Sequence, residues 1–488
     1  MNSLLARKVL ADALLCASAV CLVSCSRPHK PTLAITHVTV IDTNGGPPRA
    51  DMTVIIERDR LELIAPSSAT APPSGTPIVD GSGRFLMPGL ADMHVHLTGA
   101  GEPDGSRQFL LPLLLANGIT TVRDLGGYLE SLIPLRKEIR EGKRDAPQVF
   151  FAGPYLDGNP PSFEPSLVVN TAADADERVH ELVARGVDFI KVQSALSRDA
   201  YFGIAAASKR EHISFVGHVP DRVTAAEASD AGQRSIEHLT GVLRACSHSE
   251  KRLMREQFRV PRHKQTPAGS SARQLAWQGE LLRTQSAKFT SALLEEFSHN
   301  QTWQVPTLVM LRNVAFPTAS GNLGADPRTQ FIPRRILEGW KKDRSELLSA
   351  RPAEFRMRQA LLDRSFEIVG KMNAAGVRIM AGTDTAAPFV FPGTSLHDEL
   401  ALLVEAGLTP LEALEAATRR PAEFLGRLEE QGTVEPGKIA DLLLLDANPL
   451  DNIGNIRQIR AVILRGKLFD RPALDAMLAR VRAFAAAR

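Results

Sequence analysis

The stretch PGLADMHVHL (residues 88–97) decides the fold that the rest of the chain is expected to adopt. It reads as a short apolar strand, and alternate residues of a strand point to the same face. His94 and His96 therefore share one face, while the apolar residues between and beside them share the other. An isolated His-x-His pair is weak evidence for a metal site. This pair gains weight from its place at the end of the first strand in a repeating series.

Seven further apolar runs follow this strand and alternate with helical patterns. They are ITTVRDLG (119–126), QVFFAG (148–153), DFIKVQ (188–193), ISFVGHVP (213–220), RSIEHL (234–239), WQVPTLVM (303–310) and VRIMAGTD (377–384). Strands that alternate with helices form parallel sheets, and eight such units close into a barrel. The sequence therefore predicts an α/β fold with a (β/α)8 TIM-like barrel over residues 89–424. A doubly wound open sheet with extra strands is the alternative.

Both ends of the chain flank this barrel with short strands. Strand-like runs occupy residues 31–88 and return within residues 425–470. Neither segment is long enough for a stable sheet with its own core, so both are expected to meet in one small β-sandwich domain. Residues 248–300 are polar and predict a helical insertion of the kind that often roofs an active site. Residues 471–488 predict a C-terminal amphipathic helix.

The composition is that of a folded protein that relies on its core or on a metal. Of the 488 residues, 44% are hydrophobic and 23% are charged, which excludes a disordered, collagenous or coiled-coil chain. The net charge of +3 is spread without long blocks of one sign, so no nucleic-acid partner is expected. Three of the four cysteines lie in the first 25 residues, and the fourth, Cys246, is expected to be a buried small hydrophobe.

The first 25 residues read as an export signal. Arg7 and Lys8 precede an apolar run that ends in Leu-Val-Ser-Cys at Cys25, which resembles the signal of bacterial lipoproteins. On this interpretation Cys25 is acylated, and the lipid anchors the chain at the bacterial cell envelope, on the outer membrane facing the periplasm. Cleavage after the small-residue pattern that ends at Ala19, or an apolar N-terminus of a cytosolic protein, are the alternatives.

Four later strands also end in residues of a type that binds metals. Lys191 lies in the fourth strand on the face opposite its apolar neighbours, where burial of its ammonium group is costly and lowers its pKa. A neutral amine in such a place can take up carbon dioxide and become an anionic carbamate. His218 and His238 end the fifth and sixth strands, and Asp384 ends the eighth.

Each of these residues has a structural explanation when it is taken alone. Lys191 could extend to solvent, a single histidine is more often a core or loop residue, and Asp384 could cap the following helix. Ligand-type residues at five strand ends are hard to explain as independent coincidences. Because nitrogen and oxygen donors are present and thiolates are absent, zinc, manganese, cobalt or iron would suit the site.

Taken together, these motifs are similar to those of the amidohydrolase superfamily, in particular its binuclear branch of imidazolonepropionase-like proteins and zinc-dependent, prolidase-type dipeptidases. The similarity extends from about residue 32 to 468 and rests on PGLADMHVHL, GITTVRDLGG, GVDFIKVQ, VGHVP, AGQRSIEHL, AGTD and the long stretches 393–426 and 432–450. The resemblance implies two divalent metal ions, most commonly zinc. It also implies their ligands: one ion bound by His94, His96 and Asp384, the other by His218 and His238, and a carboxylated Lys191 bridging both.

The resemblance also implies a mechanism and a class of substrate. Two metal ions about 3.5 to 4 Å apart would share a hydroxide that attacks the scissile carbonyl. Asp384 would act first as general base and then as general acid for the departing amine. The expected reaction is hydrolysis of an amide in a small molecule, either a dipeptide or an N-acyl amino acid. A lactone, carbamate or phosphoester substrate, an envelope lipoprotein that binds without turnover, and a homo-oligomeric assembly all stay open.

The loop after the third strand departs from the prolidase-type pattern. Dipeptidases of this branch commonly carry a Gly-Gly-His element there, whereas residues 152–165 read AGPYLDGNPPSFEP without a histidine. Since loops of this kind set specificity, the departure leaves the substrate class open. Arg123, Tyr155 and Asp157 are candidate substrate contacts, and Arg123 would suit a substrate carboxylate. His397 is expected to support the helix that follows it.

Overall fold

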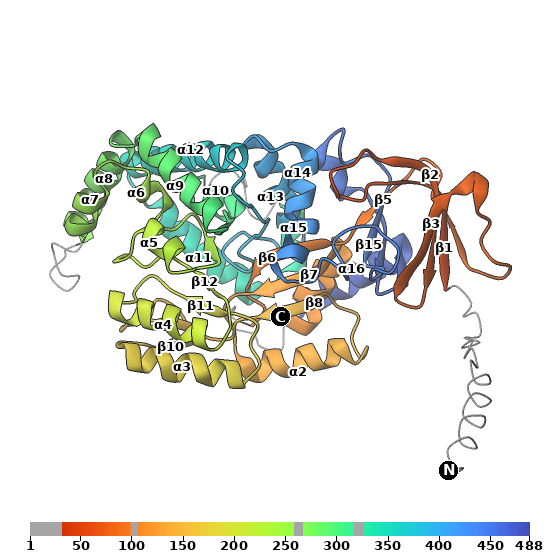
Figure 1. The fold of residues 1–488 in the computed structure, drawn as a ribbon, viewed down its shortest axis with the longest axis horizontal. Coiled ribbons are helices and arrows are strands. Elements are labelled where there is room, and N and C mark those ends of the chain that lie inside the picture. Colours follow the sequence, from red (N-terminus) through yellow and green to blue (C-terminus); the bar gives the residue numbers. More distant parts are fainter. Residues whose placement is uncertain (1–31, 99–105, 258–266, 317–325) are drawn as a thin grey trace, which may run out of the picture.

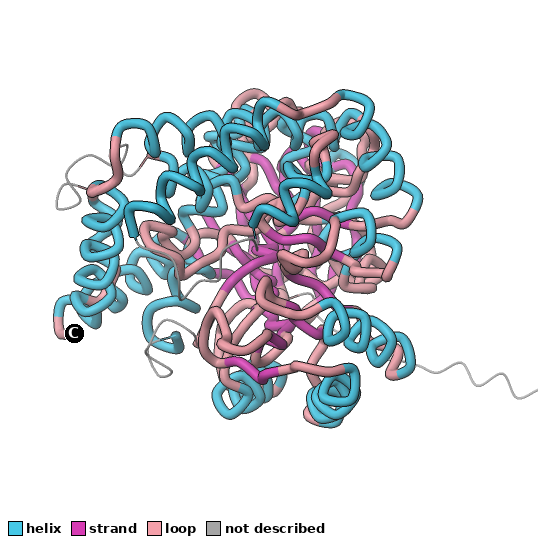
Figure 2. The backbone as a smooth tube through the Cα atoms, turned by 90° about the vertical axis from the view of Figure 1, so that its left-hand side faces the viewer, coloured by secondary structure: helices cyan, strands magenta, loops and turns pink. Residues whose placement is uncertain are grey.

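The computed structural model describes residues 32–98, 106–257, 267–316 and 326–488. Strands lie at the centre of its larger part and helices surround them (Figure 2). A second, β-rich part lies at one end of the long axis (Figure 1). The predicted combination of an α/β barrel with a β-rich domain is therefore confirmed. The predicted export signal, with Cys25, lies outside the described residues and stays a prediction.

The barrel strands belong to two hydrogen-bonded sheets of order β6-β7-β8 and β10-β9-β11-β12-β13-β14. Their bounds are β6 (Leu90–Val95), β7 (Ile119–Asp124), β8 (Gln148–Phe151), β9 (Tyr155–Asp157), β10 (Ser166–Val168), β11 (Ile190–Val192), β12 (Phe215–Gly217), β13 (Ser235–Glu237) and β14 (Trp303–Val305). All the pairs are parallel. The third predicted strand, residues 148–153, corresponds to β8, and the separate strand β9 follows after Pro154, which has no N–H to donate to a ladder.

The eighth predicted strand, residues 377–384, forms no regular ladder, which corrects the sequence prediction. It nevertheless closes the ring, because backbone hydrogen bonds of 2.9 Å and 3.0 Å join it to β14 and β6. Gly382 permits the close fit: a Cβ there would lie 2.6 Å from Val305 Cγ1 and 3.0 Å from the backbone nitrogen of His94. The segment thus runs tightly between both neighbours, and this path brings Asp384 directly beside His94.

Helices pack around the outside of the ring and bury their apolar faces against it (Figure 2). They are α1 (Leu111–Ala116), α2 (Leu129–Arg140), α3 (Ala172–Ala184), α4 (Arg198–Arg210), α5 (Ala225–Asp230), α6 (Val242–Ala245), α10 (Leu308–Ala315), α11 (Arg334–Leu348), α12 (Pro352–Ala374), α13 (Thr394–Glu405), α14 (Pro410–Ala416) and α15 (Arg419–Phe424). Side chains cap several of them, as Thr171 does for α3 and Ser197 for α4, which stabilises each helix by about 1 kcal/mol. Cys246, just after α6, is buried as the sequence predicts.

The predicted insertion of residues 248–300 is helical where it is described. It contains α7 (Glu250–Gln257), α8 (Pro267–Arg283) and α9 (Ala287–His299), while residues 258–266 lie outside the described ranges. Helices α7 and α8 lie at the end of the molecule opposite β1, β2 and β3 (Figure 1). None of its described residues lines the pocket at the barrel mouth, so the expected role as a roof is wrong for this part of the chain. Helices α10 and α11 contribute to the pocket instead.

The β-rich part joins both chain ends in one eight-stranded sheet of order β17-β16-β15-β5-β1-β2-β3, with β4 paired to β1. Its strands are β1 (Leu33–Val40), β2 (Arg49–Glu57), β3 (Arg60–Pro66), β4 (Ile78–Asp80), β5 (Phe85–Pro88), β15 (Leu442–Leu445), β16 (Ile459–Leu464) and β17 (Lys467–Asp470). The strands are joined by hydrogen bonds along one path, because β1 bonds to β2 and also to β4 and β5, and the predicted β-rich domain built from both chain ends is confirmed. Val54, Leu86 and Leu442 share one buried cluster, so both chain ends contribute to the same core.

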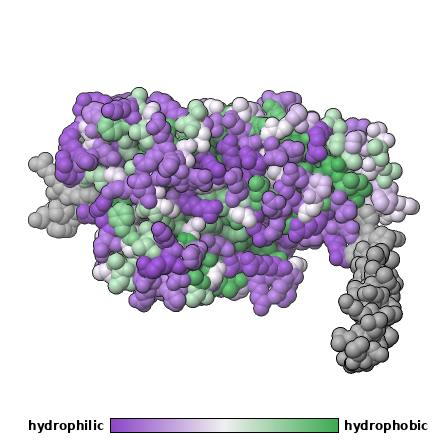
Figure 3. Space-filling model, viewed as in Figure 1, coloured by the Kyte–Doolittle hydropathy of each residue, from purple (hydrophilic) through white to green (hydrophobic). Residues whose placement is uncertain are grey.

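The last residues of the chain form a helix that packs against the barrel. Helix α16 (Arg471–Ala486) follows β17 and packs against α1, which links the last residues of the chain to the barrel. On the face shown in Figure 3, hydrophilic residues cover most of the surface and hydrophobic residues form small, separate areas. Within the described ranges, no helix combines the length and the apolar character that a membrane crossing requires.

Candidate metal centre

The side chains predicted from five strand ends lie together in one pocket at the mouth of the barrel. All six predicted metal ligands are among the residues that line it: His94, His96, Lys191, His218, His238 and Asp384. The ring centres of His94 and His238 are 4.5 Å apart, and those of His218 and His238 are 5.1 Å apart. Residues that are up to 290 positions apart in the chain thus form one cluster, which the strand-end pattern alone predicts.

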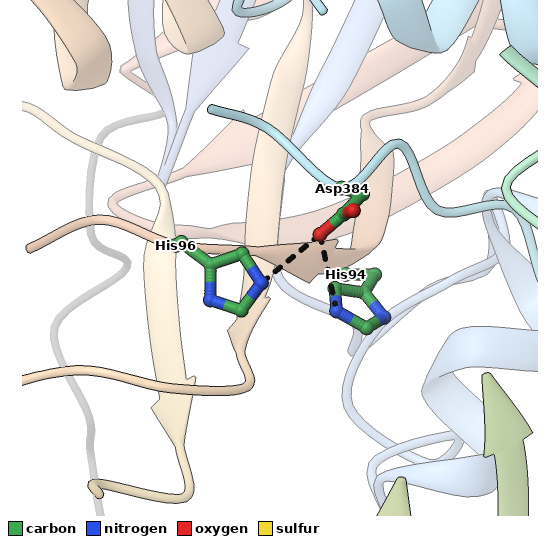
Figure 4. Close-up of side chains that lie close together, drawn as sticks. All are labelled: His94, His96 and Asp384. Carbon is green, nitrogen blue, oxygen red and sulfur yellow. Dashed lines mark hydrogen bonds and ion pairs between the residues drawn. The ribbon is translucent and has the colours of Figure 1, made fainter. Parts of the chain in front are cut away.

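Three of these residues form the tightest group (Figure 4). Asp384 Oδ1 lies 3.0 Å from His96 Nε2 and 3.5 Å from His94 Nε2. One ligand atom from each residue can be chosen so that all three lie within 4.8 Å of one another. Two imidazole nitrogens and one carboxylate oxygen at this spacing could hold a divalent cation such as zinc.

Each of the four imidazoles is held through its Nδ1 atom. The partners are Glu237 Oε2 for His94 (2.9 Å), the Gly126 carbonyl for His96 (3.2 Å), Ser194 Oγ for His218 (2.8 Å) and Thr307 Oγ1 for His238 (2.7 Å). Metal-binding histidines are ordinarily oriented in this way, with the second ring nitrogen bonded to a protein acceptor. The arrangement leaves every Nε2 atom to face the pocket or its other side chains.

His94 Nε2 supplies the clearest sign that something is bound here. The side chain is 1% exposed, and Nε2 has no hydrogen-bond partner among the described residues. A buried nitrogen without a partner costs about 1 to 3 kcal/mol, and coordination to a cation would remove that cost. The residues present therefore fit a metal ion.

The protonation states also suit metal binding. Burial, assisted by the charge of Lys191, holds the pKa values of His94 and His218 well below the usual value, and burial lowers the pKa of His238 to about 4. Burial alone would lower the pKa of His96 too, but the adjacent Asp384 carboxylate raises it. Three of the four imidazoles are thus neutral at neutral pH, as ligands must be.

Lys191 is 1% exposed and lies among these groups, as the sequence predicts. Burial lowers its pKa to about 8, although the charges of Glu237 and Asp384 partly offset that effect. Gly217 allows β12 to approach it closely, because a Cβ at this glycine would lie 2.9 Å from Lys191 Cδ and 2.3 Å from the Val192 carbonyl oxygen. The glycine before His218 therefore has a packing role that the sequence motif alone does not explain.

Glu237 is a residue of the site that sequence reasoning missed. Strict alternation along β13 would put Glu237 and His238 on opposite faces. The backbone at His238 instead takes a positive φ of 58°, as it does at Thr307 (47°) and Asp384 (65°). Such values are uncommon outside glycine and cost about 1 to 3 kcal/mol each. The turn allows Glu237 to contact His94 while His238 lines the pocket.

Arg123 does not line the pocket, which contradicts the predicted contact with a substrate carboxylate. Its side chain is fully buried, with Nη2 2.9 Å from Glu237 Oε1 and Nε donating to the Met93 carbonyl at 2.7 Å. The guanidinium also lies 5.0 Å from the centre of the Phe424 ring. The place of Arg123 near the end of the second strand did not show the depth at which its side chain ends. Arg123 reaches the metal centre only through Glu237, which it shares with His94.

The other candidates divide between the pocket and the scaffold. Tyr155 lines the pocket, and its Oη lies 3.2 Å from His96 Nδ1. Asp157 does not line it, and its carboxylate accepts three backbone N–H groups of the surrounding loops. His397 Nε2 donates to the Asn117 carbonyl at 2.9 Å and so ties α13 to the end of α1.

Parts of the chain match a family model and several curated proteins. The model of the amidohydrolase family matches residues 308–469. The N-substituted formamide deformylase of Arthrobacter pascens is 28% identical over 150 residues, which cover 29% of this chain and 25% of that protein. The imidazolonepropionase of Chromobacterium violaceum is 39% identical over 89 residues, or 17% of this chain and 20% of that protein. The chain thus matches a quarter or less of the length of these curated relatives.

Solved structures resemble the chain over most of its length. Bottromycin amidohydrolase has a TM-score of 0.71 at 23% identity and covers 93% of this chain and 90% of its own. A Xaa-Pro dipeptidase with methionine bound in its active site has a TM-score of 0.65 at 19% identity, with 90% of this chain and 99% of that chain covered. At these identities the likeness concerns the fold, which includes both the barrel and the β-rich part.

Proposed function

We propose, because the chain belongs to the amidohydrolase superfamily, that it is a metal-dependent hydrolase that cleaves the carbon–nitrogen bond of an amide. The observation that carries this proposal is the set of four imidazoles around Asp384 and Lys191, each fixed through Nδ1. The relative named for deformylation of N-substituted formamides supports an amide as the reacting group. The segments that match the relatives are short, so the activity of the whole chain is proposed from its own site and is not taken over from the relatives.

Two divalent ions, best fitted by zinc, are inferred to occupy the centre. His94, His96 and Asp384 would hold one ion and His218 and His238 the other, with Lys191 between them as a carbamate. A lysine with a pKa of about 8 is partly neutral at neutral pH, and the neutral amine is the form that adds carbon dioxide, losing one proton as the anion forms. When bound, such ions polarise a substrate carbonyl and make water acidic enough to attack it.

Asp384 is the proposed proton carrier. Its carboxylate lines the pocket, and the charge of His238 and the contact with His96 lower its pKa even though burial alone would raise it. It is therefore ionised at neutral pH and can accept the proton of the attacking water. Delivery of this proton to the departing nitrogen would convert a poor leaving group into a neutral amine.

Tyr155 is the proposed hydrogen-bond donor to the substrate. If His96 presents Nε2 to a cation, its Nδ1 carries the hydrogen, which is then shared between the Gly126 carbonyl and Tyr155 Oη. The phenolic proton of Tyr155 is not used in that contact. Because burial raises the pKa of Tyr155 above its usual value, the phenol stays protonated and can donate to a substrate oxygen.

Metal analysis and an amide screen test the proposal together. The purified full chain is expected to carry about two divalent ions and to hydrolyse members of a library of N-formyl and N-acyl amines. A chelator should abolish the hydrolysis and zinc should restore it. Absence of both bound metal and hydrolysis across the library, in protein that remains folded by circular dichroism, would contradict the proposed function.

A further inference from the structure

The pocket has a second part whose character differs from that of the metal centre. We call it the outer wall, and its members are Phe163, Met310, Val314, Leu347, Pro388 and Phe389. They come from the loop after β9, from α10 and α11, and from the segment before α13. The whole cavity has a volume of about 750 Å³, which is in the range of pockets that enclose drug-sized molecules.

The outer wall leaves large apolar side chains in contact with water. Phe163 is 58% exposed and Val314 is 38% exposed, and both lie at the pocket. Phe163 also contacts an aromatic residue beside the metal centre, since its ring centre lies 6.3 Å from that of Tyr155. An apolar group that covered this surface would be stabilised, because apolar area on both sides is removed from water. The wall is therefore suited to a bulky alkyl or aryl substituent.

The charges around the cavity argue against an anionic substrate. Among the described lining residues outside the metal centre, Glu164 is the single charged side chain, and it is exposed at the rim. Arg344 lies 5.9 Å from the centre of the Phe389 ring but does not line the cavity, and Arg123 is paired with Glu237. A dipeptide or N-acyl amino acid would place its carboxylate against apolar side chains without a cationic partner, which is unfavourable.

Gln193 offers a neutral anchor beside the metal centre. It comes directly after the end of β11, two positions beyond Lys191, it is 3% exposed, and it lines the cavity. Its Oε1 atom is buried and has no hydrogen-bond partner among the described residues. An unsatisfied buried acceptor is costly, and the N–H group of a substrate amide would satisfy it. This part of the site thus fits an uncharged N–H.

We propose that the site accepts uncharged amides with a bulky apolar substituent in preference to dipeptides and N-acyl amino acids. The inference rests on the proposed amide hydrolysis and adds the substrate class. The apolar substituent lies against the outer wall, and the amide N–H faces Gln193. Outside the metal centre, the described lining offers no cationic partner for a carboxylate. The site therefore favours an uncharged substrate.

A pair of compounds that differ only in one carboxylate tests this preference. N-octanoyl-2-phenylethylamine is N-octanoyl-phenylalanine without the carboxylate. With the metal-loaded full chain, kcat/KM is expected to be on the order of 100-fold higher for the neutral compound, because its competitor must bury an unpaired anion. An equal or higher kcat/KM for the carboxylate would overturn the inference.

A charge introduced at the wall gives a second test. Val314→Arg supplies the missing cation, and it is expected to reduce the preference for the neutral compound at least about 10-fold. Leu63→Arg is the matched control, because Leu63 is 40% exposed on β3 and does not line the pocket; it should keep the wild-type ratio. An unchanged ratio in folded Val314→Arg protein would show that the wall does not contact the substituent.

Binding without turnover separates this inference from the proposed function. Calorimetry on zinc-loaded Asp384→Asn protein measures the affinity for both compounds directly. Tighter binding of the neutral compound with no hydrolysis by the wild type would refute the proposed function and retain the substrate class. Hydrolysis of both compounds with tighter binding of the carboxylate would refute the substrate class and retain the proposed function. Failure to bind either compound would overturn the substrate class as well.

Discussion

The metal centre and the outer wall share one pocket but are built by opposite means. In the centre, each histidine side chain has its own polar partner at Nδ1, such as Glu237 for His94 and Ser194 for His218. In the wall, α10 is fixed mainly at its start, where Glu399 accepts the N–H groups of Leu308 and Val309 at 3.0 and 2.7 Å. The residues at the strand ends thus determine the reaction, whereas the segments between the strands determine which substrates reach the metal centre.

The largest effect is expected from Asp384→Asn. The asparagine cannot carry the proton from water to the leaving nitrogen, so kcat should fall about 10²- to 10⁴-fold while KM changes little. Steady-state kinetics with zinc-loaded protein measures both constants. Asp446→Asn is the control, because Asp446 is 46% exposed in the β-rich part. An equal loss in kcat and in substrate affinity would assign Asp384 to binding instead of proton transfer.

Metal removal should lower the stability of the fold through the metal centre, and the outer wall should play no part in this effect. Without a cation, the buried His94 Nε2 has no hydrogen-bond partner among the described residues, and Asp384 Oδ1 lies 3.5 Å away. The folded state therefore loses the free energy of metal binding. That loss is about 4 kcal/mol when the free metal stands at 1,000 times its Kd. Differential scanning calorimetry should therefore show a lower Tm after chelation, and zinc should reverse it. The double variant His94→Ala/His96→Ala, which removes two of the three proposed ligands of one ion, should show a clearly smaller response than the wild type; a response of wild-type size would place that ion elsewhere.

The contrast also explains how much the sequence could predict. The six residues of the centre were predictable because imidazoles, a lysine and an aspartate stand at strand ends, and the ends of parallel strands meet at one mouth. The partners were less predictable, since Glu237 and His238 both face the centre, and strict alternation fails at His238, where the backbone is left-handed. Arg123 was assigned to the substrate because it lies near the end of the second strand, and that position does not give the depth at which a long side chain ends in the barrel.

The outer wall could not be predicted for a different reason. Met310 ends the run 303–310 that reads as the seventh strand, but the strand stops at Val305 and α10 begins at Leu308. Val314 lies beyond that run, on the same helix. The apolar pattern of a short buried helix resembles that of a buried strand. Phe163 lies in a loop whose path no periodicity describes. Segments that depend on tertiary contacts for their shape thus carry the specificity.

A smaller effect is expected from Ser194→Ala, which removes the hydroxyl that orients His218 at 2.8 Å. The ring would be free to rotate, and metal affinity should fall about 10- to 100-fold. Competition with a chromogenic chelator measures it. Ser208→Ala is a matched control, because the Ser208 hydroxyl is buried on α4 without a partner among the described residues. Equal affinities in the two variants would deny Ser194 an orienting role.

The smallest effect is expected from Val314→Ala in the outer wall. The change removes apolar area from a side chain that is already 38% exposed, so KM for an octanoyl amide should rise only about 3-fold. Metal affinity and kcat should stay at wild-type values, because Val314 belongs to the wall and none of the polar contacts of the centre involves it. A fall in kcat together with an unchanged KM would mean that the wall positions the reacting carbonyl. The division between a centre that reacts and a wall that selects would then be wrong.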